Sequence, residues 1–368
     1  MMKITIEQSA LLKALAHAQS IVERRQTIPI LANVLMETVE GGVQLKATDN
    51  ELEIAEKIPA TVVEEGAITV PAHKLYDIVR RLPEGSELSL TYVEESAQVN
   101  IVSGRSKFSL ASIAPEGFPS MAREEPPFSF TLSAVDLLML INQTSFAVSV
   151  EETRYNLNGI FLHEKDDKLV AVATDGHRLA CAKIAMPDGA KGMPGVIIPR
   201  KTISEIAKLA AENVESIQVA LSANQIRFQM GEMELSSRLV DGTYPDYEKV
   251  IPTNNDKTLD ADAKALASVI ERVSVVSEKS RGIKLSLSEN LLHVSATAAD
   301  EGSAEDELDA VYQGDAMDIG FNYRYLLDIL AQIKGQNVQI LLQDGVSPVV
   351  LKDAADESAL FVLMPMRV

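Results

Sequence analysis

One segment of the sequence brings together residue types that could transfer protons. Residues Thr174–Arg178 place the carboxylate of Asp175 two positions before the imidazole of His177, and such a pair could act as a general base or general acid. Gly176 follows Asp175, and an Asp-Gly pair is typical of tight turns, which bring flanking side chains to the surface through backbone geometry alone. Taken by itself, the segment favours a turn over a proton-transfer site.

The remaining reactive side chains form no recognisable catalytic set. The single cysteine, Cys181, lies in the apolar strand pattern Leu179–Ala182, which favours a core residue over a nucleophile. The sequence contains no phosphate-binding loop, dinucleotide-binding turn, nucleophile elbow or His-Glu-x-x-His pair, and no Cys/His cluster has metal-ligand spacing. We therefore expect a protein that is not an enzyme, with no catalytic residue, metal or cofactor.

The composition predicts a soluble protein with an excess of acid. Its 34 basic and 53 acidic side chains give a net charge of −19, the reverse of the basic footprint of an ordinary nucleic-acid binder. No segment approaches the ~20 apolar residues that a membrane span requires. The N-terminus lacks the pattern of a secretory leader, and one cysteine allows no internal disulfide, so we expect the reducing cytoplasm and no membrane partner.

The same succession of elements occurs three times, with a period of about 125 residues. A strand followed by a helix is predicted first, and then a strand containing Ala-Thr. A second strand end and helix come later. These three signals lie at Thr5–Leu12, Leu45–Asp49 and Val70–Leu75 in the first pass, at Thr131–Leu138, Val172–Asp175 and Ile198–Ile203 in the second, and at Thr258–Leu266, Val294–Thr297 and Ile319–Tyr323 in the third.

Segments rich in Pro, Asn and Glu at 124–127 and 252–256 separate the three passes and predict linkers. The predicted domains are therefore 1–126, 127–254 and 255–368. Between the helices, apolar and polar residues alternate with the period of a strand. Each domain is expected to be α+β, with two helices and about eight mainly antiparallel strands.

The first predicted helix carries charge on one face only. Leu11, Leu15, Ala18 and Val22 form an apolar stripe, while Lys13, His17, Ser20 and Arg24 lie on a different face that contains no acid. Lys74, Arg81 and Lys201 are basic residues of later helices. Basic helix faces of this kind are either simply solvated or contact the phosphates of DNA, and the charges alone leave both readings open.

Ordered segments along the whole chain carry a family resemblance. They are Ile28–Leu31, Thr69–Ala72, Leu82–Gly85, Ser103–Ser106, Arg154–Gly159, Ala173–Ala180, Leu239–Gly242, Tyr244–Tyr247 and Met364–Val368. On these segments the sequence resembles the beta subunits of bacterial DNA polymerase III, the sliding clamps.

The resemblance implies three repeated domains of the DNA clamp fold and a head-to-tail homodimer, which closes into a six-domain ring with helices lining the hole. Such a ring would encircle duplex DNA, slide without sequence specificity and tether the replicative polymerase. Retention would then be topological, so few phosphate contacts are needed and the acidic composition is a weaker objection. The alternative is a structural scaffold of three repeated domains that does not meet DNA.

The resemblance also assigns residues to DNA contact. Arg25 on a loop, and Arg154 with Tyr155, are the positions that it implies, although Glu151 and Asn156 depart from the family pattern in that second loop. The basic residues of the helices complete the expected DNA-binding set of Arg25, Arg154, Tyr155, Lys13, Arg24, Arg81 and Lys201.

A shared peptide pocket is the second implied site. Its expected partners are the catalytic subunit of DNA polymerase III, the clamp loader complex, and other DNA polymerases, ligase and mismatch-repair proteins with short linear motifs. Lys249 and Pro348 depart from the pattern at its edge. Pro365 should end the last strand and leave the side chains around it exposed. The expected pocket residues are Leu157, Thr174, Gly176, His177, Arg178, Leu179, Pro245, Val250, Asn322, Tyr325, Val362, Met364, Pro365, Met366 and Arg367.

The dimer interface is expected where the repeats leave unmatched edges, at the first domain of one chain and the third domain of the other. Apolar residues should supply most of the affinity, and ion pairs mainly the register. The expected residues are Lys74, Arg105, Lys107, Phe108 and Leu110 on one side and Val275, Val276, Glu301, Glu305, Asp306 and Glu307 on the other.

Overall fold

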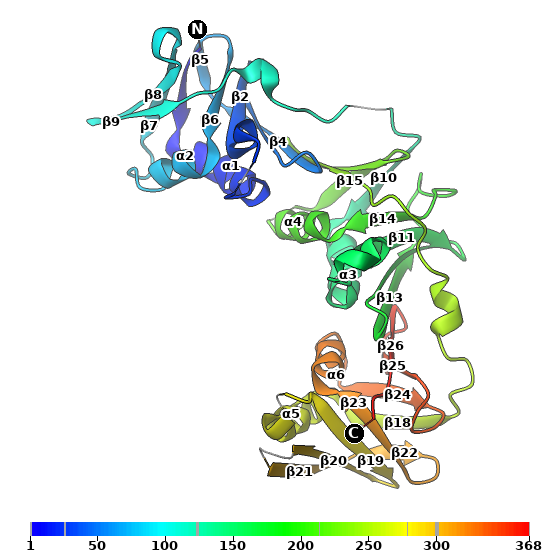
Figure 1. The fold of residues 1–368 in the computed structure, drawn as a ribbon. Helices are drawn as coiled ribbons and strands as arrows, with labels where there is room; N and C mark the ends of the chain where they lie inside the picture. Colours follow the sequence, from blue (N-terminus) through cyan, green and yellow to red (C-terminus); the bar gives the residue numbers. More distant parts are fainter. Residues whose placement is uncertain are drawn as a thin grey trace. The chain divides into compact units, whose positions relative to one another are not determined.

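The computed structural model describes residues 2–25, 27–122, 125–212, 214–277, 279–298 and 302–367. The chain divides into two compact units (Figure 1). The first comprises Met1–Val135 and Lys201–Leu239, and the second comprises Asp136–Arg200 and Val240–Val368. The central repeat is thus shared between the two units, because its strands continue the sheets of both neighbouring repeats.

The first unit contains two antiparallel sheets of five and eight strands, in the orders β5-β1-β7-β8-β9 and β10-β15-β16-β17-β4-β3-β2-β6. Its elements are β1 (Lys3–Glu7), α1 (Gln8–Ile21), β2 (Asn33–Val39), β3 (Gly42–Thr48), β4 (Leu52–Pro59), β5 (Thr61–Glu64), β6 (Ala67–Pro71), α2 (Ala72–Val79), β7 (Glu87–Val93), β8 (Gln98–Ser103), β9 (Ser106–Ala111), β10 (Phe128–Ser133), α4 (Arg200–Ala210), β15 (Ser216–Leu221), β16 (Gln225–Met230) and β17 (Met233–Arg238).

The second unit contains sheets of nine and four strands, in the orders β14-β11-β12-β13-β26-β25-β24-β18-β22 and β21-β20-β19-β23. Its elements are α3 (Ala134–Thr144), β11 (Gly159–Lys165), β12 (Lys168–Thr174), β13 (Arg178–Ala185), β14 (Val196–Pro199), β18 (Lys257–Asp262), α5 (Ala263–Ser274), β19 (Gly282–Ser288), β20 (Leu291–Ala298), β21 (Gly302–Asp309), β22 (Val311–Gln313), β23 (Met317–Asn322), α6 (Tyr323–Leu330), β24 (Asn337–Leu342), β25 (Val349–Asp353) and β26 (Ala359–Leu363).

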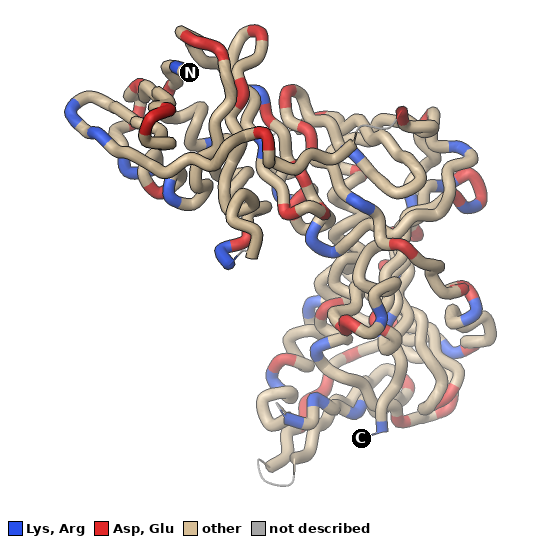
Figure 2. Tube along the Cα trace, turned by 45° about the horizontal axis from the view of Figure 1, so that its top comes forward, with Lys and Arg blue, Asp and Glu red and all other residues tan. Residues whose placement is uncertain are grey.

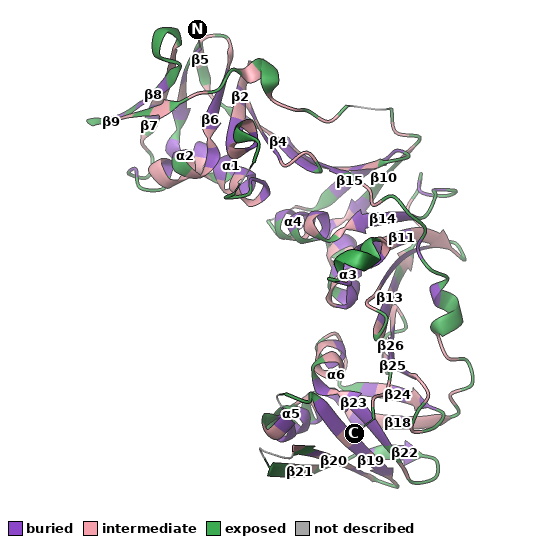
Figure 3. Ribbon diagram, in the orientation of Figure 1, coloured by how far each residue is buried: buried purple, intermediate pink, exposed green. Residues whose placement is uncertain are grey.

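The helices pack their apolar stripes inward. Leu11, Leu15 and Ala18 of α1 are buried, as the stripe predicted, and Figure 3 shows buried residues along both α1 and α2. The helix ends at Ile21, however, so Val22 and Arg24 lie beyond it. The expectation that Arg24 continues the charged face of this helix is therefore wrong.

Each repeat opens with a strand that leads into a helix, β1 into α1, β10 into α3 and β18 into α5. The third repeat is offset from the pattern expected from the sequence. Asp262 caps α5 by accepting a hydrogen bond from the main-chain N–H of Ala265 at 2.8 Å, so Asp260, and not Thr258, occupies the place of Thr5. For the same reason Asn322, the N-cap of α6, and not Gly320, matches Pro71, the N-cap of α2.

Main-chain ladders join consecutive repeats. In the first unit β17 of the central repeat pairs with β4 of the first repeat. In the second unit β13 of the central repeat pairs with β26 of the third repeat. Each junction is therefore a continuous antiparallel sheet, and its strength comes from hydrogen bonds that carry little sequence information.

A buried histidine reinforces the junction in the first unit. His17 of α1 lies with Nδ1 2.8 Å from Glu56 Oε2 and Nε2 3.1 Å from Glu212 Oε2, and Lys13 Nζ lies 3.7 Å from the same Glu212 oxygen. Burial opposes protonation of His17, but the hydrogen bonds and charges of the two glutamates outweigh it and raise its pKa above the ordinary value of 6.5. Protonated His17 thus links α1 to β4 and to the end of α4.

We expect His17→Gln to lower the free energy of unfolding by about 1–3 kcal/mol near pH 6, where His17 is charged in the folded state. Because the folded-state pKa is raised, the charged form stabilises the fold below the unfolded pKa, and this contribution is lost as pH rises through the folded pKa. Urea unfolding of both proteins between about pH 6 and about pH 9 measures the difference. A difference that stays constant over this range would contradict the assignment.

Candidate partner-binding site and charged surfaces

The segment from Thr174 to Arg178 is a tight turn between β12 and β13, as the sequence favoured. Asp175 Oδ1 accepts hydrogen bonds from the main-chain N–H groups of His177 at 2.9 Å and Arg178 at 3.1 Å. Thr174 Oγ1 accepts from the N–H of Gly176 at 3.1 Å, and Gly176 has a left-handed φ of +89°. Asp175 is therefore committed to the turn, and the pairing with the imidazole of His177 that proton transfer would need does not form.

Arg178 connects this turn to two other elements of the second unit. Its Nε donates to Asp175 Oδ2 at 3.1 Å, its Nη1 to Asp328 Oδ2 of α6 at 2.6 Å, and its Nη2 to the carbonyl of Phe146 at 2.6 Å. The guanidinium carbon also lies 4.4 Å from the ring centre of Tyr325 and 5.1 Å from that of Phe146. Arg178 therefore holds the second and third repeats together beneath the expected pocket, a role that the sequence did not reveal.

Three expected pocket residues belong to a buried core cluster. Leu157, Leu179 and Val362 are 8%, 2% and 3% exposed, and Leu179 and Val362 face each other across the β13–β26 ladder. They can form the floor of a site but offer little surface themselves. The cluster also contains Val170, Val172, Ile197, Tyr244 and Tyr247.

Other expected residues surround this floor and are accessible. Val250 is 53% exposed and Met364 is 44% exposed. The main-chain N–H of Met364 donates to the carbonyl of His177 at 2.9 Å, while the imidazole of His177 stacks on Tyr325 of α6 at 6.0 Å. The turn, α6 and the end of β26 thus meet at one place, where Met364 presents an adaptable apolar side chain.

The remaining expected residues lie around the same place. Asn322 caps α6 with its side-chain oxygen, which accepts from the N–H of Arg324 at 3.1 Å. The strand β26 ends at Leu363, before Pro365. Pro365, Met366 and Arg367 line a hollow of about 670 Å³ beside β23.

An aromatic stack supports the wall that carries Pro245 and Val250. The rings of Phe161 and Tyr244 are parallel within 4° at 4.7 Å, and Tyr247 Oη lies 3.0 Å from His163 Nε2. Burial raises the pKa of both tyrosines well above the usual range. The sequence did not identify Phe161 or His163, since partners so distant in the chain give no local signal.

The single cysteine belongs to the nine-stranded sheet of the second unit. Cys181 of β13 packs against the core cluster, and burial raises the pKa of its thiol from 9.0 to about 11. A thiol with so high a pKa is almost entirely protonated near neutral pH, so it is a poor nucleophile. This agrees with the core role expected from the sequence.

The expected DNA-binding residues on helices are largely neutralised. The charged face of α1 contains no acid of its own, but Glu212, from beyond the end of α4, lies 3.7 Å from Lys13 and offsets its charge. Lys201 bonds the carboxylate of Asp49 and the carbonyl of Ile21, and Arg81 lies 3.4 Å from Asp77. Figure 2 shows basic and acidic residues interspersed along the trace of each unit. These ion pairs offset the positive charges that would attract the phosphates of DNA.

The expected DNA-binding residues on loops are more accessible. Arg24 and Arg25 are exposed beyond the end of α1. Tyr155 is 59% exposed, whereas its neighbour Arg154 bonds Glu151 at 3.1 Å. Glu151, one of the departures from the family pattern, thus offsets the charge of Arg154.

The expected dimer residues gather at two sheet edges. β9, which carries Lys107, Phe108 and Leu110, is the last strand of the five-stranded sheet, and β21, which carries Glu305 to Glu307, is the first strand of the four-stranded sheet. Arg105 and Lys74 are exposed, Val275 is 68% exposed and Val276 is half-buried. Asp306 already bonds Arg272 of α5 at 2.7 Å. Glu301 lies outside the described residues.

Comparison with known proteins identifies the fold. The N-terminal, central and C-terminal domains of the DNA polymerase III beta subunit match residues 2–122, 131–246 and 248–367. The beta sliding clamps of Caulobacter vibrioides and Escherichia coli K12 are 42% and 39% identical to the chain, each over the full length of both proteins.

The chain belongs to the beta sliding clamp family. Its function is that of a DNA sliding clamp. The crystal structure of the sliding clamp from Bartonella birtlesii bound to griselimycin has a TM-score of 0.97 and 45% identity over all of both chains. A Caulobacter crescentus clamp has a TM-score of 0.97 and 42% identity, covering 100% of this chain and 99% of that one.

The match confirms the predicted α+β class and the three repeated domains of the DNA clamp fold, and a ring formed by two chains is consistent with these homologues. In the parts of the chain that the structure describes, no helix is long and apolar enough to cross a membrane.

We expect Arg178→Met to destabilise the second unit by about 2 kcal/mol, because it leaves Asp175 and the half-exposed Asp328 without their cation. Arg154→Met is the matched control, since Arg154 and Glu151 are both about half exposed, and it should cost less than about 0.5 kcal/mol. Urea unfolding of the three proteins measures both changes. Equal costs for the two variants would show that Arg178 does not connect the repeats.

Proposed function

We propose that two copies of the chain pair head to tail into a ring of six domains, which encircles duplex DNA and slides along it without sequence specificity. The main support is that the two internal junctions share one register. Two further strands of the same kinds, β9 and β21, each have only one neighbour among the described strands. Domain boundaries near 126 and 254 accompany this arrangement.

The internal junctions define the register. Ile54 of β4 faces Leu235 of β17 in the first unit, and Ala180 of β13 faces Phe361 of β26 in the second. Ile54 and Ala180 are equivalent, because their partners on the preceding strand, Ala47 and Ala173, each stand one residue before the Thr of the Ala-Thr signal. Ala304 of β21 pairs in the same way with Ala296.

The residues on the second strand of each junction, β17 and β26, are also equivalent, as the pairing across the sheets shows. Leu235 and Phe361 occupy equivalent positions in their repeats. In each repeat the path starts at the fourth residue before the first helix and passes from strand to strand through the residues that pair directly across the sheet. These paths run from Phe130 through Val219 and Phe228 to Leu235, and from Leu259 through Ile340 and Leu351 to Phe361. In the first repeat the same path runs from Ile4 through Leu90 and Ile101 to Phe108 of β9.

Ala304 of one chain should therefore face Phe108 of the other. This antiparallel register places Lys107 opposite Glu305 and Arg105 opposite Glu307, so that opposite charges meet on the exposed face. Phe108 and Ala304, which are both half-buried, meet on the other face. The register follows from the hydrogen-bonded ladders alone, so the complementary charges support the pairing independently. Lys74, Leu110, Val275 and Val276 would complete the contact.

The ring would hold DNA through topology more than through affinity. Arg24, Arg25 and Tyr155 offer accessible contacts, while Lys13, Arg81, Arg154 and Lys201 are partly neutralised by the acids described above. Direct binding to linear DNA should then be weak and salt-sensitive. Contacts of this kind carry no sequence preference, so sliding remains easy.

The place where the turn at Thr174–Arg178, α6 and the C-terminal run meet is proposed as the peptide site. An apolar floor of Leu157, Leu179 and Val362, with exposed Val250 and Met364, suits a short hydrophobic motif. The partners would be the catalytic subunit of DNA polymerase III, the clamp loader complex, and other DNA polymerases, ligase and mismatch-repair proteins. Thr174, Gly176, His177, Pro245, Asn322, Tyr325 and Pro365–Arg367 surround the floor, and Arg178 positions it.

Within this proposal the chain is a processivity factor of the cytoplasm and performs no catalysis. The turn that uses Asp175, and the high pKa of Cys181, leave neither group available for chemistry. The rival reading, a scaffold that never meets DNA, has no counterpart among the sliding clamps to which the chain is similar.

Charge reversal tests the interface register. We expect Lys107→Glu to raise the dimer Kd at least tenfold, because it places two acids opposite each other at both interfaces. Adding Glu305→Lys to the same chain should restore much of the loss, since the pair is reformed with exchanged signs. Equilibrium sedimentation measures the Kd, and Lys191→Glu, at an exposed position far along the chain, is the control. Absence of rescue would contradict the register.

Truncation tests the peptide site. A pentapeptide bearing a hydrophobic pair should bind the intact chain in the micromolar range, about −8 kcal/mol. Removal of residues 364–368, or Met364→Glu, should abolish this binding but leave the dimer unchanged, because the proposed interface strands lie elsewhere. Fluorescence polarisation and sedimentation measure the two properties. A truncated dimer that binds the peptide with unchanged affinity would place the site elsewhere.

A further inference from the structure

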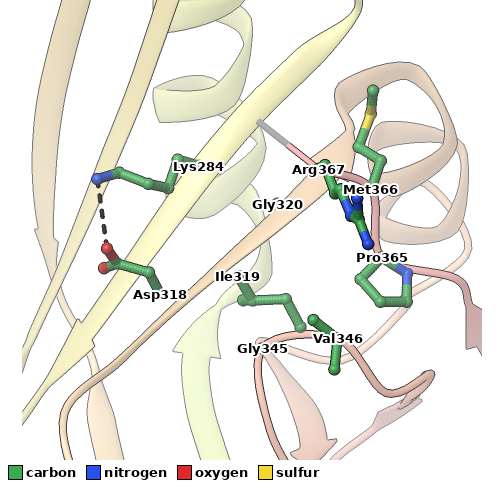
Figure 4. A pocket seen from close by; sticks show the side chains of 9 residues that line it. All are labelled: Lys284, Asp318, Ile319, Gly320, Gly345, Val346, Pro365, Met366 and Arg367. Atoms are coloured by element: carbon green, nitrogen blue, oxygen red, sulfur yellow. Dashed lines mark hydrogen bonds and ion pairs between the residues drawn. The ribbon is translucent and has the colours of Figure 1, made fainter.

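A hollow of about 670 Å³ adjoins the proposed peptide site. It is lined by Lys284 of β19, residues Asp318–Gly320 of β23, the pair Gly345–Val346, and the C-terminal run Pro365–Arg367 (Figure 4). The run also borders the peptide site, where Met364 bonds His177. A peptide lying on Met364 therefore has direct access to the hollow.

The walls of this hollow are fixed by hydrogen bonds and close packing. Asp344 Oδ1 accepts from the N–H groups of Val346 at 2.9 Å and Ser347 at 2.7 Å. A Cβ on Gly345 would come within 2.3 Å of the carbonyl oxygen of Asp318, and the N–H of Met366 donates to the carbonyl of Gly320 at 2.8 Å. The hollow is thus preformed, which lowers the entropic cost of binding.

The charges that face the hollow favour an anion. Figure 4 shows Lys284 reaching Asp318, 3.4 Å away, on one side, while Arg367 stands beside Met366 on the other. Hydrogen bonds from Ser286 and Lys284 hold the pKa of Asp318 below its usual range, and the charge of Lys284 offsets that of the carboxylate. Arg367 is exposed and has no ion pair among the described residues, so one positive charge is left over.

A smaller hollow of about 320 Å³ extends this surface. It shares Lys284, Met366 and Arg367 with the first and adds residues that carry hydroxyl groups but no carboxylate, namely Ser280, Ser295 and Thr297. Val346, which is 77% exposed, supplies an apolar edge to the larger hollow. A carboxylate on a short aliphatic stem matches this combination, because guanidinium groups bind carboxylates through two parallel hydrogen bonds.

We propose that this hollow binds a carboxylate side chain in the flank of a partner peptide, whose hydrophobic pair occupies the proposed peptide site. The inference rests on the proposed function of that site. In a chain of net charge −19, acids are repelled from most of the surface, so a local cationic hollow distinguishes partners with an acidic flank from those without one.

The test compares three peptides of equal length, which share one hydrophobic pair. One has two glutamates before the pair, one has two glutamates after it, and one has glutamines at all four positions. Fluorescence polarisation at low salt should show that at least one acidic peptide binds about two- to fivefold more tightly than the glutamine peptide. The advantage should disappear at high salt.

Two variants should change the difference in affinity between the acidic peptides and the glutamine peptide, in opposite directions. Lys284→Gln should reduce it, and Asp318→Asn should increase it, while neither alters binding of the glutamine peptide. Lys191→Gln, an exposed lysine paired with Asp167, is the matched control and should change nothing. A glutamine peptide that fails to bind would contradict the proposed function itself. Equal affinities of the acidic and glutamine peptides would overturn only the inference. Binding of a short oligonucleotide that depends on Lys284, without tighter binding of the acidic peptides, would overturn it as well.

Discussion

The pairing of exposed strand edges determines how the repeats of this chain are joined. An edge strand presents unpaired N–H and C=O groups, and folded proteins must cover them or pair them. Here β4 pairs with β17 and β13 pairs with β26 inside the chain. The equivalent strands β21 and β9 each have only one neighbour among the described strands. In the proposed ring a second copy of the chain would supply the missing partner for each, so that closure would repeat a contact that the chain already makes twice.

This constraint also accounts for the charge of the molecule. A protein held on DNA by closure does not need a strongly basic surface, and strong phosphate binding would slow its movement. The basic residues of the helices are accordingly used within the fold. Lys201 of α4 joins Asp49, and His17 of α1 joins two glutamates. The same side chains that resemble a DNA-binding face therefore hold neighbouring repeats together, and the acidic excess remains compatible with a clamp.

Patterns within short segments of the sequence predicted the features that depend on neighbouring residues. Alternation and turn chemistry were sufficient for the three repeats, the turn at Thr174–Arg178 and the buried stripe of α1. The sequence could not predict contacts such as Arg178 with Asp328, 150 positions apart, or His17 with Glu212, 195 positions apart, because no periodicity connects such residues. It also misplaced two anchors of the third repeat, where Asp262 and Asn322, and not residue similarity, fix the start of each helix. The family resemblance supplied the peptide site, but the burial of its floor was visible only in the structure.

A covalently closed ring would show whether two chains encircle DNA. Lys107→Cys and Glu305→Cys would place two thiols opposite each other in the proposed register, and Cys181 should not interfere because its partly buried thiol has a pKa raised to about 11. After loading onto circular DNA and oxidation, the protein is heated in detergent. A ring that encircles DNA should stay on intact circles and leave when the DNA is cut. Failure to cross-link two chains, or equal release from circular and cut DNA, would contradict the proposed ring.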